Sequence, residues 1–234
     1  MRRQHREQVL TLKPDRISFF GYAHVPWLKK HQSMIDIKAL PDSDNRMMQA
    51  NLASELLRDA GYIRIGFDHF ALPGDEMAKS LVARQLKRNF QGCTLDNAAA
   101  LIGFGASAIS KLPQGYIQNI AAIGQYQQSI ERDGLAVTRG FELGEEDRMR
   151  GYLIEKLMCD LEFSKTEIFE RFGDAAMDVI DEATELLRDV DTGFLTATKD
   201  GFRVTEKGRP HLRTICAHFD PYFKTEKARH SLAV

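Results

Sequence analysis

The chain contains few cysteines, and they do not cluster. Among 234 residues the only cysteines are Cys93, Cys159 and Cys216, which lie far apart in the sequence. No Cys-x-x-Cys pair is present, so neither a disulfide framework nor a local cysteine-ligated metal site is indicated. Such sparse cysteine usage is typical of a reducing compartment, and we expect a cytoplasmic protein.

Strong net charge and long apolar segments are also missing. With 32 Lys and Arg against 33 Asp and Glu, the formal net charge is −1, which argues against chain-wide affinity for nucleic acid. No apolar run approaches the roughly 20 residues of a membrane-spanning helix. The basic start is interrupted by Lys13 and Pro14 before a signal-peptide core can form. The length is sufficient for one large or two modest globular domains.

The first part of the chain alternates between strand and helix signals. Residues 15–24 are predicted to form a strand, and Asp42 or Ser43 can cap a helix that Gly61 ends. A second strand is predicted over residues 62–70. Strand, helix and strand in this order predict a βαβ-like unit, in which functional groups gather where strands end.

The middle of the chain contains a glycine-rich segment that we expect to be functional. Gly103 and Gly105 flank Phe104 in a predicted strand over residues 100–110. Such glycines mark either the close approach of a ligand or a tight crossing of two backbones, and both interpretations stay open. The flanking segments predict two helices and one extended piece, over residues 75–86, 119–132 and 137–143.

After Gly144 the pattern becomes mainly helical, and we place a domain boundary there, giving domains 1–143 and 144–234. Ser164 and Asp174 are predicted to begin two helices. A hairpin with Asp200-Gly201 at its turn follows, which completes a winged-helix-like pattern. DNA binding is therefore an alternative function, but the acidic residues of the second helix oppose it: Glu182, Glu185 and Asp189.

Several side chains are candidates for chemistry, each with a structural alternative. His24 and His69 end the two predicted strands and could share a metal or a proton, or each could satisfy backbone groups. Asp75 could pair with Asp68 or Glu76, although capping of the next helix is the favoured role.

Three further candidates have little support from their neighbours. Ser107 and Ser110 have no adjacent base. Cys93 lies in no recognisable catalytic pattern.

Four segments in register resemble oxygen-independent coproporphyrinogen III oxidases of the radical S-adenosylmethionine class. They are Tyr22-Ala23-His24-Val25-Pro26, Gly66 to Ala71 with Asp75-Glu76 behind it, Arg88-Asn89-Phe90-Gln91-Gly92, and Gly103 to Ser110. The resemblance runs from about Pro14 to the C-terminus. The segment from Arg88 to Gly92 favours the oxidase over a haem-binding chaperone of the same superfamily.

The resemblance implies an α/β fold. Residues 14–24 would be the last strand of an incomplete six-stranded β/α radical-S-adenosylmethionine barrel, followed by α/β elements and a helical winged-helix-like domain. The implied reaction is oxidative decarboxylation of coproporphyrinogen III to protoporphyrinogen IX in haem biosynthesis, with S-adenosylmethionine and a 4Fe-4S cluster as cofactors. The family suggests a monomer, and from the charge and the lack of long apolar runs we expect neither nucleic acid nor membrane as a partner.

One departure from the family pattern matters for function. The family's Cys-x-x-x-Cys-x-x-Cys motif, which holds the cluster, is absent from this sequence. The chain therefore resembles the C-terminal half of the enzyme, and we expect it to be inactive alone. Its missing N-terminal half could be supplied as a separate partner chain.

The resemblance also assigns site residues. Ala23 and Ile109 match positions that contact S-adenosylmethionine, and both are apolar. Phe90 and Gln91 match an aromatic-amide pair of functional importance near the active site, where an amide can orient a ligand by hydrogen bonds. The structural alternative is that Phe90 belongs to the core and that Gln91 caps a loop.

Overall fold

The computed structural model describes residues 3–90, 92–189 and 193–223. The chain forms two compact units, one made of residues 1–95 and 152–234 and the other of residues 96–151. The chain passes between the units twice, after residue 95 and again after residue 151 within α5 (Glu145–Asp160). In the described ranges, no helix is both long and apolar enough to cross a membrane.

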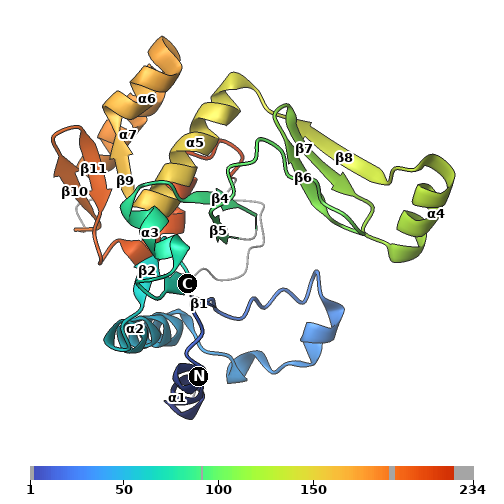
Figure 1. Cartoon of the computed structure of the whole chain (residues 1–234), viewed down its shortest axis with the longest axis horizontal. Coiled ribbons are helices and arrows are strands. Elements are labelled where there is room, and N and C mark those ends of the chain that lie inside the picture. Colours follow the sequence, from blue (N-terminus) through green and yellow to red (C-terminus); the bar gives the residue numbers. More distant parts are fainter. Residues whose placement is uncertain (1–2, 91, 190–192, 224–234) are drawn as a thin grey trace. The chain divides into compact units, whose positions relative to one another are not determined.

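The first unit is mixed α/β (Figure 1). Apart from α5, its α-helices are α1 (Arg3–Leu12), α2 (Ser43–Asp59), α3 (Glu76–Val82), α6 (Lys165–Phe172), α7 (Met177–Asp189) and α8 (Leu212–Ala217). Its strands are β1 (Arg16–Ser18), β2 (Ile63–Ile65), β3 (His69–Ala71), β4 (Lys87–Asn89), β5 (Gly92–Thr94), β9 (Glu162–Ser164), β10 (Leu195–Thr198) and β11 (Gly201–Val204). Short 3-10 helices are η1 (Lys30–Met34), η2 (Ile37–Ala39), η3 (Gly173–Ala176) and η4 (Arg209–His211).

The first sheet has the order β1-β3-β2 and differs from the predicted βαβ unit. β3 pairs antiparallel with both neighbours, so β1 and β2 run parallel but are not adjacent. The single strand predicted over residues 62–70 is wrong, because the chain reverses after β2 to form a hairpin. Gly66 makes this turn possible, since it has φ +52° and a Cβ there would lie 2.7 Å from the carbonyl oxygen of Met158.

The strand predicted over residues 15–24 is much shorter than expected. Only β1 pairs with β3, and one further hydrogen bond joins the Phe19 N–H to the Asp68 carbonyl at 2.8 Å. β3 is itself three residues long, so residues 20–24 have no strand to pair with. All strand pairs in the described residues are antiparallel, and no closed barrel forms there.

Helices α2 and α3 begin as predicted. The Asp42 side chain accepts a hydrogen bond from the Asn45 N–H at 2.8 Å, and Asp75 accepts from the Met77 N–H at 2.7 Å. The helix that Asp75 caps ends at Val82, four residues earlier than predicted. The buried cluster that includes α3 residues is Ile65, Ala71, Met77, Ala78, Leu86, Cys93 and Cys159, whereas Leu57 of α2 packs in a second cluster with Tyr62 and Phe70.

The predicted helix pair and hairpin are present after residue 160. Ser164 caps α6 by accepting from the Glu167 N–H at 3.0 Å, and β10 and β11 form the hairpin. Asp174 does not cap α7 as predicted, because it lies in η3. The sequence also gave no sign of β9, which pairs with β11 and completes a three-stranded sheet of order β10-β11-β9.

The second unit contains β6 (Ile109–Leu112), β7 (Gly115–Asn119), β8 (Val137–Glu142) and α4 (Ile123–Asp133) (Figure 1). The strand predicted over residues 100–110 is wrong, because most of that segment is a loop with one bridge between Leu101 and Lys111. Gly103 lies against the chain's own backbone, and a Cβ there would be 2.6 Å from the Ile109 carbonyl oxygen. β8 confirms the extended piece that was predicted, whereas β7 was missed.

Candidate functional site

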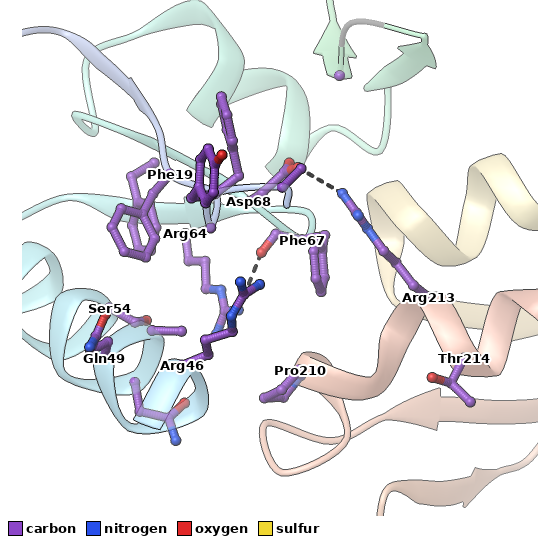
Figure 2. Close-up of a pocket in the computed structure, with 18 of the residues that line it drawn as sticks. Phe19, Arg46, Gln49, Ser54, Arg64, Phe67, Asp68, Pro210, Arg213 and Thr214 are labelled. Carbon is purple, nitrogen blue, oxygen red and sulfur yellow. Dashed lines mark hydrogen bonds and ion pairs between the residues drawn. The ribbon is translucent and has the colours of Figure 1, made fainter. Parts of the chain in front are cut away.

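A cavity of about 720 Å³ opens in the first unit. Its wall is formed by the residues after β1, by α2, by the turn between β2 and β3, by the β4–β5 hairpin and by α8 (Figure 2). This volume lies within the range of roughly 300–1,000 Å³ that is usual for small-molecule sites. The cavity therefore has room for one sizeable organic ligand.

The lining combines aromatic rings with positive charge. Seven aromatic side chains contribute, namely Phe19, Phe20, Tyr22, Phe67, Phe70, Phe90 and Phe223. The charged lining residues are Arg46, Arg64, Arg88, Arg213 and one carboxylate, Asp68. A flat or bowl-shaped apolar ligand that carries negative groups would match this combination.

Arg64 is a partly buried cation of this lining. Its Nη2 donates to the carbonyl oxygen of Phe67 at 3.2 Å, while its Nε is buried without a hydrogen-bond partner among the described residues. Burial is the main cause that lowers the pKa of Arg64 to about 10, and the nearby charge of Arg209 adds to it. A buried donor without a partner is costly, so this guanidinium is well suited to an anionic ligand.

Asp68 lies at the centre of a charged cluster at the β2–β3 turn. Its Oδ1 is 2.7 Å from Nδ1 of His69 and 3.7 Å from Nη1 of Arg88, and its Oδ2 is 3.6 Å from Nη2 of Arg213. Burial opposes its ionisation, but the hydrogen bond with His69 and the charge of Arg88 outweigh burial and lower the pKa of Asp68. Arg213 also lies 4.7 Å from the centre of the Phe67 ring.

His69 connects this cluster to two thiols beneath the β4–β5 hairpin. It hydrogen-bonds to Asp68 and to Cys93, and these bonds raise the pKa of His69 to about 9. Arg88 donates from Nη1 to Sγ of Cys93 at 3.6 Å. A hydrogen bond with Cys159, then those with His69 and the charge of Arg88, lower the pKa of Cys93 to about 5, against the effect of burial.

Gly92 allows His69 to approach the hairpin. A Cβ on Gly92 would lie 2.5 Å from Cε1 of His69, and the φ of +129° also excludes most other residues. Asn89 pairs with Gly92 across β4 and β5, so Phe90 and one further residue make the whole connection. Glycine at this position therefore lets the imidazole pack directly under the turn that carries Phe90.

The cluster leads to a prediction about the thiol of Cys93. We expect this residue to be a thiolate at neutral pH, and the thiolate to be lost as the pH falls through about 5. The difference in ultraviolet thiolate absorbance between the parent and Cys93→Ser, recorded across pH, measures the ionised fraction of Cys93. His69→Gln should move the midpoint upward, because it removes a hydrogen bond and a positive charge from the sulfur.

Cys216 supplies the control for this titration. Burial raises the pKa of Cys216 to about 12, so Cys216→Ser should leave the thiolate absorbance at neutral pH unchanged. Equal absorbance of the parent and Cys93→Ser at pH 7 would contradict the prediction.

The structure brings together two of the four site residues expected from the sequence. Ala23 and Phe90 both line the cavity, and Phe90 is 48% exposed. Gln91 lies outside the described residues. Ile109 lies on β6 in the other unit and is 36% exposed.

The other candidates have mainly structural roles. Asp75 caps α3 and pairs with Arg16 Nε at 2.8 Å, and Ser110 Oγ accepts a hydrogen bond from the Gly103 N–H at 3.0 Å. His69 binds Asp68 and Cys93, whereas both ring nitrogens of His24 are buried without a hydrogen-bond partner among the described residues, so the prediction that His24 satisfies backbone groups is wrong. No group of three or more His, Cys, Asp or Glu side chains in the described part of the chain could hold a metal ion.

The arginines of the cavity were missed in the sequence. Arg64, Arg88 and Arg213 lie far apart along the chain and come from β2, β4 and α8. Only Arg88 belongs to one of the four family-like segments. Their common location depends on tertiary structure, and no local spacing could indicate it.

Comparison with known proteins finds relatives along almost the whole chain. Residues 143–211 match the family described as HemN C-terminal domain. The oxygen-independent coproporphyrinogen III oxidase of Bradyrhizobium diazoefficiens is 44% identical over 225 residues, covering 96% of this chain and 50% of that protein. The anaerobic coproporphyrinogen III oxidase 1 of Cereibacter sphaeroides is also 44% identical, over 228 residues, covering 97% of this chain and 50% of that protein.

A solved structure agrees with these relatives. The HemN coproporphyrinogen III oxidase of Escherichia coli, described as a radical SAM enzyme, matches with a TM-score of 0.86 and 35% identity. The match covers 93% of this chain and 50% of the Escherichia coli chain, so this chain shares the fold of the C-terminal half of a radical SAM enzyme. It is homologous to the C-terminal half of the oxygen-independent coproporphyrinogen III oxidases. The chain spans about half the length of the relatives that it matches.

Proposed function

We propose that this chain is the substrate-covering half of an enzyme that converts coproporphyrinogen III to protoporphyrinogen IX without oxygen. The observation that carries the proposal is the cavity of about 720 Å³, which combines aromatic rings and arginines. Three of the four family-like segments contribute to its wall, through Ala23, Asp68 and Phe90. Coproporphyrinogen is a large ring system with carboxylate side chains, and its chemistry matches this lining.

The cofactors of the family divide unequally between this chain and the rest of the enzyme. S-Adenosylmethionine supplies the radical chemistry, and we propose that Ala23 and Ile109 contribute apolar contacts to it. The described residues do not fit a 4Fe-4S cluster, since no three thiols converge. Cluster ligands must therefore come from residues outside this sequence.

Further parts of the proposal concern organisation. Residues 14–24 would complete the family's six-stranded β/α barrel once its other strands are present, and residues 144–234 would form a C-terminal domain. The match of residues 143–211 to the HemN C-terminal domain supports this division. We propose a cytoplasmic monomer once the two halves are together, with no role for nucleic acid.

The roles of this chain's residues are to bind, orient and exclude water. Aromatic rings around the cavity would cover the ring system, and Phe90 would lie near the reacting propionate. The guanidinium groups would hold carboxylates that do not react. Such positioning is what protein groups contribute when a cofactor supplies the difficult chemistry.

Reassembly tests the proposal. This chain is joined, or mixed, with the N-terminal half of a family enzyme that carries the cysteine motif, and is assayed anaerobically with coproporphyrinogen III, S-adenosylmethionine, a reductant and a cell extract as source of the electron acceptor. We expect protoporphyrin fluorescence after oxidation, and none from either half alone. The control is the same N-terminal half with its own C-terminal half. Activity of that control without activity of the reassembled enzyme would refute the proposal.

A further inference from the structure

The segment that follows β1 forms part of the cavity wall without belonging to a sheet. The wall includes Phe19, Phe20, Gly21, Tyr22 and Ala23. Within the described ranges, the backbone of residues 20–24 takes part in no strand pairing and in no backbone–backbone hydrogen bond. Another group must hold this part of the wall, because backbone polar groups that leave water need hydrogen-bond partners.

The side chain of Gln32 is such a partner. Its Oε1 accepts a hydrogen bond from the Val25 N–H at 2.6 Å, and its Nε2 donates to the Ala23 carbonyl oxygen at 3.1 Å. One partner is a donor and the other an acceptor, so the amide fits them in one orientation only. Gln32 is 8% exposed and does not line the cavity. It therefore holds the chain on both sides of His24 without occupying the ligand's space.

Gln32 is itself fixed by a compact loop, because it lies in η1. The Gln32 N–H donates to the Lys29 carbonyl oxygen at 2.8 Å. The Val25 carbonyl oxygen accepts from the N–H groups of Leu28 and Lys29, both at 2.9 Å. Short-range bonds thus lead the chain from Val25 back to Gln32, and the amide reaches Ala23 from a defined position.

His24 shows that this conformation has to be held. Both of its ring nitrogens are buried and have no hydrogen-bond partner in the part of the chain that the structure describes. Buried polar atoms without partners are costly, so the imidazole opposes the conformation of residues 23–25. The two bonds from Gln32 offset this cost at the residues directly before and after His24.

We propose that Gln32 is a positioning residue for the cofactor contact of Ala23. This inference rests on the proposed function, which assigns to Ala23 an apolar contact with S-adenosylmethionine. Because Gln32 occupies the Ala23 carbonyl oxygen, Ala23 offers the ligand its methyl group rather than an unpaired carbonyl. Loss of the amide would release residues 20–24 and displace this part of the wall.

Hydrogen exchange of the full chain tests the two hydrogen bonds without any ligand. Gln32→Met removes both bonds at a similar side-chain length, whereas the carboxylate of Gln32→Glu keeps an acceptor for Val25 but has no donor for Ala23. We expect the Val25 amide to exchange about tenfold faster in Gln32→Met than in the parent, and to stay protected in Gln32→Glu.

Ser33→Ala is the matched control. Ser33 Oγ donates to the Lys30 carbonyl oxygen at 2.6 Å, so this variant removes a side-chain hydrogen bond from the same 3-10 helix without touching residues 23–25. The Val25 amide should exchange in Ser33→Ala as it does in the parent. An unchanged far-ultraviolet circular dichroism spectrum is the folding control for all three variants.

Cofactor binding tests the positioning role. S-Adenosylmethionine is titrated by equilibrium dialysis against the reassembled enzyme with its cluster and without a reductant, so that no turnover occurs. We expect Gln32→Met and Gln32→Glu both to weaken this binding by about tenfold, because both lose the bond to Ala23. The KM for coproporphyrinogen III, measured with a reductant, should change less, and Ser33→Ala should change neither quantity.

The outcomes separate this inference from the proposed function. Parental S-adenosylmethionine binding by both Gln32 variants, or an equal loss in Ser33→Ala, would show that Gln32 does not position Ala23. A loss confined to Gln32→Met would indicate a role in loop stability alone and would also overturn the inference. If cofactor binding follows Gln32 but the parent assembly forms no protoporphyrinogen IX, the positioning role stands and the proposed reaction is wrong.

Discussion

Phe90→Ala and Gln91→Ala are each expected to lower the rate of the reassembled enzyme by about a hundredfold or more. Phe90 lies on the wall of the cavity and is 48% exposed, so it covers little core that folding would need. Abstraction of a hydrogen atom by a radical requires the substrate carbon to be held in a near-attack geometry. A displacement of about 1 Å can lower the rate by about a hundredfold. Anaerobic turnover at saturating coproporphyrinogen III measures the effect.

The hairpin itself supports a functional role for this pair. Asn89 and Gly92 are paired across β4 and β5, and the sequence places only Phe90 and Gln91 between these two paired residues. Such connections favour Asn-Gly, Asp-Gly or a glycine in the turn, not a bulky aromatic residue followed by an amide. Turn residues that differ from those usually favoured in this kind of turn are typical of a site under functional constraint.

Two variants control for nonspecific damage. Phe169→Ala removes a ring on α6 that is 45% exposed and lies outside the cavity, and Gln85→Ala removes an exposed amide before the hairpin. Both should retain near-parental turnover. Near-parental turnover of the Phe90 and Gln91 variants, with intact cluster content, would show that the assigned site is wrong although the family assignment stands.

Local sequence signals predicted the helix caps and the C-terminal hairpin because they act over a few residues. The caps Asp42, Asp75 and Ser164 each accept the expected backbone N–H, and Asp200-Gly201 turns the hairpin. Strand signals were less informative. The apolar run over residues 62–70 could not reveal the reversal at Gly66, which depends on a close contact with Met158.

The candidate site was predictable only where a family-like motif marked it. Ala23 is a small apolar residue with no chemistry of its own, and residue-level reasoning gave no reason to select it. The Asp68–His69–Cys93 contacts join the β2–β3 turn to β5 through tertiary packing. Cys93 had seemed an isolated loop thiol, yet the fold places it beside Cys159, which is distant in the sequence.

The chain alone is expected to take up no stoichiometric 4Fe-4S cluster. Cys93 and Cys159 lie together, but no third described ligand joins them, and burial raises the pKa of Cys216 to about 12, which disfavours the thiolate that iron requires. Anaerobic reconstitution, followed by iron and sulfide analysis and visible absorption, measures the content. The reassembled enzyme should instead hold a full cluster.

The variants Cys93→Ser and Cys159→Ser test whether the buried thiol pair binds any iron that the isolated chain takes up. Because Cys93 is expected to be a thiolate beside a second thiol, the chain could collect substoichiometric iron, which these variants would remove. A stoichiometric cluster in the isolated chain that either serine variant abolished would show that the buried pair ligates iron. Not all cluster ligands would then come from outside this sequence, because the chain would supply thiolates to the cluster itself.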